Sequence, residues 1–444
     1  MGFVLGEYRI EGRRAADISA SVERAVGQGR LAPGDVLPPL RELAVELGVN
    51  HNTVAAAYRM LRDRGVIETA GRRGSRVRPR PATTPRELIA VEAPGARDVA
   101  SGNPDPDLLP PLAEALTAAA GQARRPVLYG EPPVDTELER LAREAFMAEG
   151  VPPGPVAVTS GALDGIERVL SAHLRPGDAV AVEDPGWGNV LDLVPALGLR
   201  TVPVPLDDEG PLPAGVDRAL RQGARALLVT GRAQNPTGAA ITEERARELR
   251  AVLAGHPGVL LVEDDHGHGI VDVPLRPLGG VTTHWALVRS VAKTLGPDLR
   301  LAVLTGDTVT VDRVRGRQRL GQGWVSHVLQ DVVLHLWRTG AVDEAAVAAS
   351  YRRRREALVA ALHERGVEAH GRSGFNVWIP VVDETGAVAR MLQAGWAVAP
   401  GARFRIASPP GVRVTVSGLA PEEIPAVADA LAAATAPAPA GRYA

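Results

Sequence analysis

The stretch Ser290-Val291-Ala292-Lys293 follows a predicted apolar strand at Ala286–Ser290, and Arg300 lies seven residues further on. A primary amine forms a Schiff base with an aldehyde, which a guanidinium group cannot do. Ser290 and Arg300 could add a hydroxyl group and a bidentate donor for a phosphate. These residues indicate a site for a phosphorylated aldehyde, although a lysine that follows a strand can equally lie on the surface.

The composition is that of a globular protein with one unusual feature, a near absence of lysine. The 444 residues include 50 Lys and Arg, of which only Lys293 is lysine, against 52 Asp and Glu. The absence of cysteine excludes a disulfide scaffold, a Cys-ligated metal site and thiol catalysis. No apolar run approaches the roughly 18 residues of a spanning helix, and the first residues lack a signal-peptide core, so we expect a cytoplasmic protein.

From about residue 100 onward, strand and helix patterns alternate. Helical segments separate most of the strands, which is typical of a doubly wound, largely parallel α/β sheet. A long helix through Tyr351–Arg365 then leads into a smaller α+β segment. The predicted strands are Val156–Thr159, Ala179–Glu183, Thr201–Val204, Ala226–Thr230, Val259–Glu263, Ala286–Ser290 and Leu301–Leu304.

The first 80 residues have a different pattern, with three helices followed by a hairpin. Ile18 and Val22 belong to the apolar face of the first helix. The second helix ends at Gly48, and the third begins at Asn50, a favourable N-cap. Two short strands flank Gly71-Arg72-Arg73-Gly74. This order of elements predicts a winged helix-turn-helix.

Charge and composition divide the chain into parts. Residues 1–80 carry a net charge of +5, from 14 Arg and 9 Asp and Glu, and the remainder carries −7. A basic end on an acidic body indicates an anionic partner for that end. We predict a winged helix-turn-helix DNA-binding domain at residues 1–78, a Pro-rich linker at 79–98, a large α/β domain at 99–345 and a small C-terminal α+β subdomain at 346–436.

The segment Glu263-Asp264-Asp265-His266 ends another apolar strand. A carboxylate at this place could keep a pyridine nitrogen protonated. The alternatives are a solvated strand end or a divalent metal ion bound by Asp264, Asp265, His266 and His268. Because no distant set of ligands completes such a site, we predict no metal.

Two further turns follow predicted strands. Asn235, in Gln234-Asn235-Pro236-Thr237-Gly238, could donate to a phenolic oxygen, although the same residues are ordinary turn formers. Thr159-Ser160-Gly161-Ala162 joins a strand to a helix, where exposed amides could bind a phosphate. Each signal is weak alone, but the four stretches agree on one kind of ligand.

Together, these stretches resemble those of fold-type I pyridoxal-phosphate aminotransferases over residues 100–435. With its N-terminal module, the whole chain resembles the MocR/GabR class of GntR-type regulators. The N-terminal resemblance rests on the segments Leu37–Ala44, Leu47–Val54 and Gly71–Gly74.

The resemblance implies a role for each matching residue. It implies that Lys293 forms the Schiff base with pyridoxal 5′-phosphate, that Asp264 contacts the ring nitrogen and that Asn235 contacts the phenolic oxygen. Trp187 would stack on the ring. Tyr129 would reach the phosphate of a neighbouring subunit, which implies a homodimer. The residues of the phosphate site would be Gly161, Ala162, Ser290 and Arg300.

Two further positions concern the substrate and the chemistry. Arg413 resembles the family arginine that binds a substrate or effector carboxylate, although in a strand it could equally be a surface residue. His266 stands where the family usually has a tyrosine near the phenolic oxygen. An imidazole can still hydrogen-bond there but titrates near neutrality. This departure allows cofactor binding and puts ordinary transamination in question.

The N-terminal module offers basic and polar side chains to DNA. Arg41 resembles a phosphate or base contact, and Arg72 and Arg73 would reach the backbone or minor groove from the hairpin. The start of the third helix faces the position from which recognition helices read the major groove. The residues at that position are His51, Asn52 and Thr53. A small helical bundle for protein contacts is the alternative.

We therefore expect a dimeric, DNA-binding transcription regulator that senses pyridoxal phosphate or an amino compound that reacts with it. The site variants look closest to a branch of the family that responds to pyridoxal phosphate itself and controls pyridoxal salvage. One alternative is a working aminotransferase with an accessory DNA-binding module. Another is a DNA-binding protein with an empty, vestigial domain.

Overall fold

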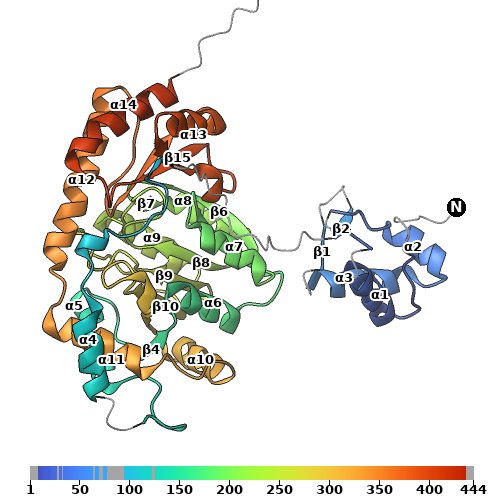
Figure 1. Cartoon of the computed structure of the whole chain (residues 1–444). Coiled ribbons are helices and arrows are strands. Elements are labelled where there is room, and N and C mark those ends of the chain that lie inside the picture. The colour runs from blue at the N-terminus through green and yellow to red at the C-terminus, as the bar shows by residue number, and fades with distance from the viewer. Residues whose placement is uncertain are drawn as a thin grey trace, which may run out of the picture. The chain divides into compact units, whose positions relative to one another are not determined.

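The chain forms two compact units, one built mainly on its first 85 residues and the other on most of the remainder (Figure 1). The computed structural model describes residues 9–27, 30–32, 34–63, 66–69, 74–77, 95–122 and 126–436. Within these ranges, no helix is both long and apolar enough to cross a membrane.

Three helices and a hairpin make up the N-terminal unit, as the sequence predicts. Gly48 ends the second helix in a left-handed conformation with φ 63°, which suits glycine. Oδ1 of Asn50 accepts the amide of Asn52 at 2.8 Å and so caps the third helix. The elements are α1 (Ala15–Gly27), α2 (Leu40–Leu47), α3 (His51–Asp63), β1 (Ile67–Thr69) and β2 (Ser75–Val77). Their apolar faces, with Ile18 and Val22 fully buried, form a single core.

An eight-stranded sheet forms the centre of the larger unit, in the order β4-β11-β10-β9-β8-β5-β6-β7. Strands β8, β9 and β10 run parallel, whereas β11 is antiparallel to both β10 and β4. The strands are β4 (Val156–Thr159), β5 (Ala179–Asp184), β6 (Arg200–Asp207), β7 (Gly210–Pro211), β8 (Ala224–Thr230), β9 (Leu260–Asp264), β10 (His284–Ser290) and β11 (Ala302–Gly306). The predicted doubly wound α/β class is confirmed.

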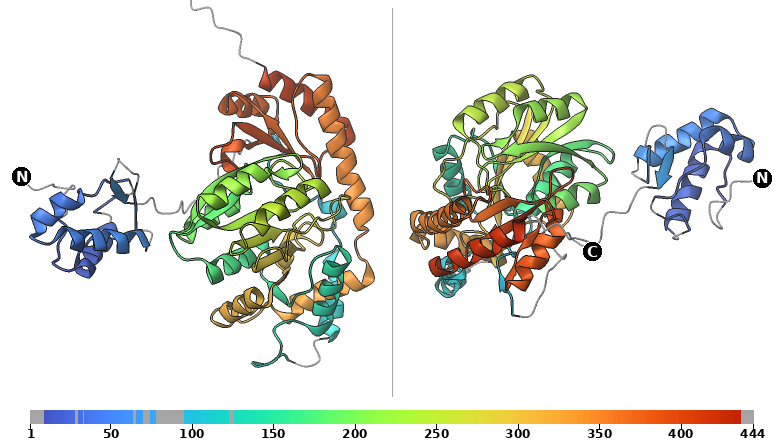
Figure 2. Two further views of the ribbon diagram at one scale, coloured as in Figure 1. Left: turned by 180° about the vertical axis from the view of Figure 1, so that it is seen from behind. Right: turned by 90° about the horizontal axis from the view of Figure 1, so that it is seen from above.

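The central strands are buried along their whole length. Every residue of β4, β5, β9 and β11 is buried, which explains why these strands are mostly apolar, although β5 and β9 each end in Glu-Asp. Helices pack against the sheet (Figures 1 and 2). Those that contact its strands include α5 (Thr136–Ala148), α6 (Ala162–His173), α8 (Pro213–Arg221) and α10 (Thr308–Arg319).

A smaller antiparallel sheet, ordered β12-β15-β14, forms the C-terminal part. Its strands are β12 (Asn376–Pro380), β14 (Ala399–Pro400) and β15 (Gly411–Thr415), and its helices are α12 (Glu344–Glu364), α13 (Glu384–Gln393) and α14 (Ile424–Thr435). Helix α12 begins before the predicted Tyr351 because the Asp343 side chain accepts the amide of Ala346 at 2.9 Å. The predicted boundary at residue 345 falls inside this helix.

The chain enters the larger unit as a strand. β3 (Arg97–Asp98) pairs in parallel with β13 (Trp396–Ala397). This strand consists of the last two residues of the predicted linker at 79–98. A strand of two residues shows no periodicity, so the sequence could not reveal it. Residues 79–94 lie outside the described ranges. The remaining helices are α4 (Leu112–Gln122), α7 (Gly188–Ala196), α9 (Glu243–Ala254) and α11 (His327–Thr339), with 3₁₀ turns at Pro106–Leu108, Pro297–Leu299, Gly401–Arg403 and Pro421–Glu423.

A buried charged cluster joins β10 to the ends of β8 and β9. Nε of Arg232 and Nε of Arg289 lie 2.8 Å from the two carboxylate oxygens of Asp265. Both arginines also pair with Glu149. Burial opposes ionisation of Asp265 most strongly, but Arg289 and Arg232 outweigh it and lower the pKa of this carboxyl. The cluster fixes the loop after β9 relative to its neighbours.

Asp265→Asn should lower the free energy of unfolding by about 3–5 kcal/mol, because it removes the buried carboxylate between two buried guanidinium groups and leaves them paired with Glu149. Asp272→Asn is the matched control, since Asp272 pairs with Arg352 at the surface and its loss should cost less than about 1 kcal/mol. Chemical denaturation of the full chain measures both values. Equal effects of the two substitutions would contradict the structural role of the buried cluster.

Candidate functional site

A cavity of about 520 Å³ lies at one edge of the eight-stranded sheet. The parallel register sets the last residues of β8 and β9, Thr230 and Asp264, side by side. Strands β4 and β10 end at the same edge, because each pairs with β11 in antiparallel fashion. The loops after these strands therefore converge. Eight of the predicted site residues line the cavity: Ala162, Trp187, Asn235, His266, Ser290, Lys293, Arg300 and Arg413.

Lys293 lies in the turn after β10 and lines the cavity. Its ammonium group donates to the carbonyl oxygen of Gly102 at 2.9 Å and lies 5.5 Å from the ring centroid of Phe375. Its half-buried position differs from that of a lysine on the outer surface. A primary amine held here can reach a ligand inside the cavity.

The predicted phosphate residues meet at the start of α6. Gly161 has φ +94°, and a Cβ atom there would lie 2.8 Å from Nη2 of Arg300. Glycine therefore allows the guanidinium group to approach the helix N-terminus. Ser290 is buried at the end of β10, a strand that α6 contacts, and accepts the amide of Ala292 at 3.1 Å. A guanidinium group, a hydroxyl and a helix N-terminus together suit an anion.

Asp264 and His266 form a buried pair beside this anion site. Nδ1 of His266 lies 2.8 Å from Oδ2 of Asp264, and Nε2 of His266 lies 2.9 Å from the carbonyl oxygen of Ala233. Oδ1 of Asp264 is buried and has no hydrogen-bond partner among the described residues. The ring of Trp187 lies 6.5 Å from that of His266, measured between centroids.

The pKa values around this pair depart from their usual ranges. Burial opposes protonation of His266 most strongly, but Asp264 outweighs it and raises the pKa of the imidazole. Glu183 is buried nearby and accepts from Thr230 and Gln234. Burial raises the pKa of Glu183 to about 7. The two carboxyl groups thus have different partners: Asp264 bonds to an imidazole, whereas Glu183 is held by neutral donors.

Arg413 is buried in the cavity wall, not exposed on its strand. It donates through Nη1 to Oδ1 of Asn235 at 2.8 Å and through Nη2 to the carbonyl oxygen of Ala100. Its guanidinium carbon lies 4.7 Å from the ring centroid of Phe404. Because Oδ1 of Asn235 is an acceptor here, its amide nitrogen is the group left to donate toward a ligand.

Several residues that line the cavity could not be predicted from the sequence. Gly102 comes from the segment between β3 and α4, whereas Phe375 and Phe404 come from the C-terminal part. None of the three carries reactive chemistry, and only the tertiary fold brings them to Lys293. Tyr129 does not line this cavity within one chain: it is 93% exposed, and its ring packs edge-on against Trp324 at 5.6 Å.

The four residues of the metal alternative point to different places. Asp264 and His266 pair with each other, whereas Asp265 binds two arginines. Glu149, Asp265 and His268 do offer ligand atoms within 4.8 Å of one another. However, both carboxylates already face the guanidinium groups of Arg232 and Arg289. Their positive charge disfavours a divalent ion at this place.

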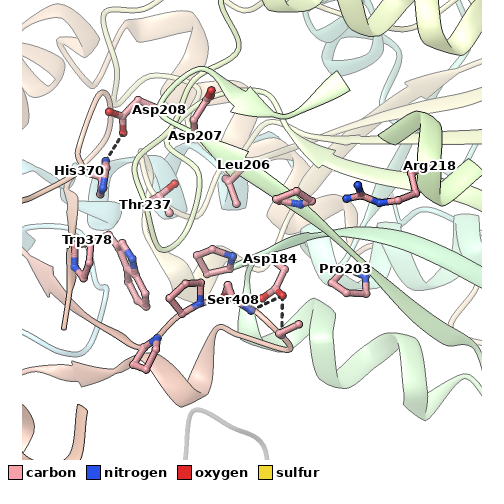
Figure 3. A pocket seen from close by; sticks show the side chains of 16 residues that line it. Asp184, Pro203, Leu206, Asp207, Asp208, Arg218, Thr237, His370, Trp378 and Ser408 are labelled. Carbon is pink, nitrogen blue, oxygen red and sulfur yellow. Dashed lines mark hydrogen bonds and ion pairs between the residues drawn. The ribbon is translucent and has the colours of Figure 1, made fainter. Parts of the chain in front are cut away.

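A second cavity, of about 530 Å³, contains none of the predicted site residues among the residues that line it (Figure 3). Several of its polar groups already have partners within the protein. Asp184 accepts the amides of Ile406 and Ser408, and Nδ1 of His370 lies 3.2 Å from Oδ1 of Asp208. Prolines form much of the remaining wall. The residue types therefore favour the first cavity as the chemical site.

The N-terminal unit presents its predicted DNA contacts in part. Arg41, in the first turn of α2, and His51 and Asn52, at the start of α3, are exposed, and Thr53 is half-buried. The predicted contacts Arg72 and Arg73 lie outside the described residues. The exposed groups on α2 and α3 are those that a helix-turn-helix can direct toward DNA.

Two family models match the chain. The aminotransferase class I and II model matches residues 97–431, and the model of bacterial regulatory proteins of the gntR family matches residues 14–77. The chain is 40% identical to the vitamin B6 salvage pathway transcriptional repressor PtsJ of Salmonella typhimurium, over 94% of this chain and 97% of that protein. It is 30% identical to the pyridoxine biosynthesis transcriptional regulator PdxR of Corynebacterium glutamicum, over 59% of this chain and 58% of that protein.

Solved structures share the fold of the larger unit. The α-aminoadipate aminotransferase LysN of Thermus thermophilus, complexed with N-(5′-phosphopyridoxyl)-L-leucine, superposes with a TM-score of 0.68 at 22% identity, covering 80% of this chain and 95% of that one. The aminotransferase fold and the gntR-type unit occur here in one polypeptide. The chain belongs to the aminotransferase class I and II family and, through its N-terminal unit, to the GntR-type transcription regulators that carry such a domain.

Proposed function

We propose that this regulator binds pyridoxal 5′-phosphate at Lys293, and that the bound cofactor controls its affinity for operator DNA. One observation carries the proposal. The single lysine of the chain lines a cavity in which the guanidinium group of Arg300 meets the start of α6. The aldehyde of the cofactor needs a primary amine and its phosphate needs an anion site, and this cavity offers both.

The polar groups of the cavity suit those of the cofactor. Arg300, Ser290 and the first amides of α6 would hold the phosphate. Oδ1 of Asp264, buried and unpartnered among the described residues, would face the ring nitrogen. The amide nitrogen of Asn235 would donate to the phenolic oxygen, and Trp187 would pack on the ring. When bound, pyridoxal phosphate supplies an aldehyde and a ring that can act as an electron sink.

The similarity to the vitamin B6 salvage repressor suggests what is regulated. A regulator of that pathway is useful if it responds to the concentration of pyridoxal phosphate itself. We therefore propose that the free cofactor is the effector and that the target genes serve pyridoxal salvage. An amino compound that reacts with the bound cofactor would be a secondary effector, with Arg413 as its carboxylate partner.

A homodimer would complete the site. Tyr129 is almost fully exposed, and its ring packs edge-on against the half-buried Trp324. We propose that Tyr129 reaches the phosphate bound by a second copy of the chain. A dimer would also present two helix-turn-helix units to a two-fold operator. Cofactor binding would then change operator affinity by a coupling free energy of about 1–3 kcal/mol.

A second candidate function is aminotransferase activity. The observation that favours it is the buried position of Arg413 beside Asn235. His266, with both ring nitrogens engaged, argues against repeated turnover. Several turnovers of an amino acid by the full chain would support the enzyme over the pure sensor.

Lys293→Arg should keep the positive charge and abolish the covalent link to the cofactor, because a guanidinium group forms no Schiff base. Borohydride reduction followed by mass spectrometry should detect a phosphopyridoxyl adduct on the wild type alone. A double variant, Lys293→Arg with Arg319→Lys, is the matched control, since it moves the one lysine to the exposed end of α10. An adduct in the single variant would refute the assignment of Lys293.

Arg41→Ala should weaken operator binding and reduce the slope of log K against log salt by about 1, because one phosphate contact is lost. Fluorescence anisotropy with labelled operator DNA at several salt concentrations measures this slope. Arg353→Ala, on the exposed face of α12, is the matched control and should leave the slope unchanged. If Arg41→Ala behaves like this control, α2 does not contact the operator.

A further inference from the structure

His266 has a hydrogen-bond acceptor at each of its two ring nitrogens. Nδ1 lies 2.8 Å from a carboxylate oxygen of Asp264, and Nε2 lies 2.9 Å from the carbonyl oxygen of Ala233. A neutral imidazole has only one N–H, whereas an imidazolium has two. A backbone carbonyl can only accept, so Nε2 must carry a proton. Nδ1 and the carboxylate of Asp264 then compete for the second proton. A carboxylate is a weaker base than an imidazole, so this proton belongs on Nδ1.

We propose that His266 is held as an imidazolium that shares Asp264 with the ring nitrogen of the bound cofactor, and so weakens protonation of that ring. The proposal rests on the proposed cofactor site and adds a reason for sensing instead of turnover. His266 is in this view a positioning residue, which acts on the cofactor through Asp264.

The geometry allows Asp264 to serve both groups. Oδ2 bonds to His266, while Oδ1 is buried and has no partner among the described residues. A ring nitrogen at Oδ1 would therefore meet a carboxylate whose charge His266 already compensates. Protonation of the ring nitrogen would then gain less from Asp264, because the imidazolium of His266 and a protonated ring at the same carboxylate repel each other. The ring would thus be a weaker electron sink than one paired with an uncompensated carboxylate.

The charges around His266 support this account. Asp264 raises the pKa of the imidazole, whereas burial and the ammonium group of Lys293 lower it, and the net shift is upward. Asp265 points instead to Arg232 and Arg289 and leaves His266 to Asp264 alone. Glu183 is held by Thr230 and Gln234, and burial, with a smaller contribution from Asp264, raises the pKa of this carboxyl to about 7.

The sign of the pH dependence follows from this upward shift. The folded chain binds a proton at His266 at pH values where the unfolded chain has lost it. This contribution to stability is fully present below the ordinary histidine pKa and is lost as the pH rises through the raised pKa of the folded state. A variant without the imidazole, His266→Gln, should therefore differ most from the wild type at the acidic end of this window.

The protonation state can be measured without cofactor. In the full chain labelled with ¹⁵N-histidine, long-range proton–nitrogen correlation should give both His266 nitrogens the shifts of N–H groups at neutral pH and above. His363, exposed on α12, is the reference histidine in the same spectra. The variants His266→Gln and His363→Gln identify the two sets of signals. A neutral His266, with one unprotonated nitrogen, would overturn the proposal.

The effect on the ring is measured with pyridoxal phosphate that carries ¹⁵N at its ring nitrogen. In the wild type, the ring-nitrogen shift should lie toward the unprotonated position, near that of Asp264→Asn. In His266→Tyr, which removes the competing cation, it should move toward the protonated position. A ring that is equally protonated in wild type and His266→Tyr would contradict shared use of Asp264.

The outcomes also separate this inference from the proposed function. If the wild type shows no saturable binding of pyridoxal phosphate, the cofactor assignment fails, while the measurement on the cofactor-free chain still decides the state of His266. If the cofactor binds and the ring is protonated as fully as in His266→Tyr, only the inference fails. Circular dichroism verifies that each variant is folded.

Discussion

The carboxylate of Asp264 is the group around which the rest of the site is arranged. The parallel register sets it beside Thr230 of β8 and Val288 of β10, and a neighbouring residue, Asp265, is fixed by two arginines. One oxygen of Asp264 is committed to His266, and the other is buried without a partner among the described residues. Such a group costs free energy unless a ligand donates to it. The cofactor would supply that donor.

The roles of arginine in this fold explain how the chain does almost without lysine. Arginine carries the buried ion pairs here, as in the cluster of Arg232 and Arg289 with Asp265, where its planar group bonds to two partners at once. Arginine also suits the phosphate and the DNA backbone. It cannot form an imine, and the one lysine lies where an imine would be needed. The cavity gives a reason for a lysine at position 293.

Much of the fold and part of the site could be predicted from the sequence, because strand ends carry local signals. The apolar runs before Asp264 and Lys293 indicated both strands, and the parallel sheet then required their loops to meet. The contact of Lys293 with Gly102 could not be predicted, because some 190 residues separate the two and neither position has a distinctive pattern. The bond between His266 and Ala233 was also missed, because it depends on how the loops after β8 and β9 meet. The family usually has a tyrosine near the phenolic oxygen at the position of His266. His266 bonds instead to Asp264 and to the carbonyl oxygen of Ala233.

Regulation by the cofactor requires that binding in the cavity changes the affinity of the N-terminal unit for its operator. The most direct measurement is operator binding by fluorescence anisotropy at fixed salt, with and without pyridoxal phosphate, for the full chain and for Lys293→Arg. The account predicts a change in Kd of roughly 5- to 150-fold for the wild type, the range of typical allosteric coupling, and a much smaller change for the variant. An unchanged Kd in wild-type protein that is saturated with the cofactor would contradict it.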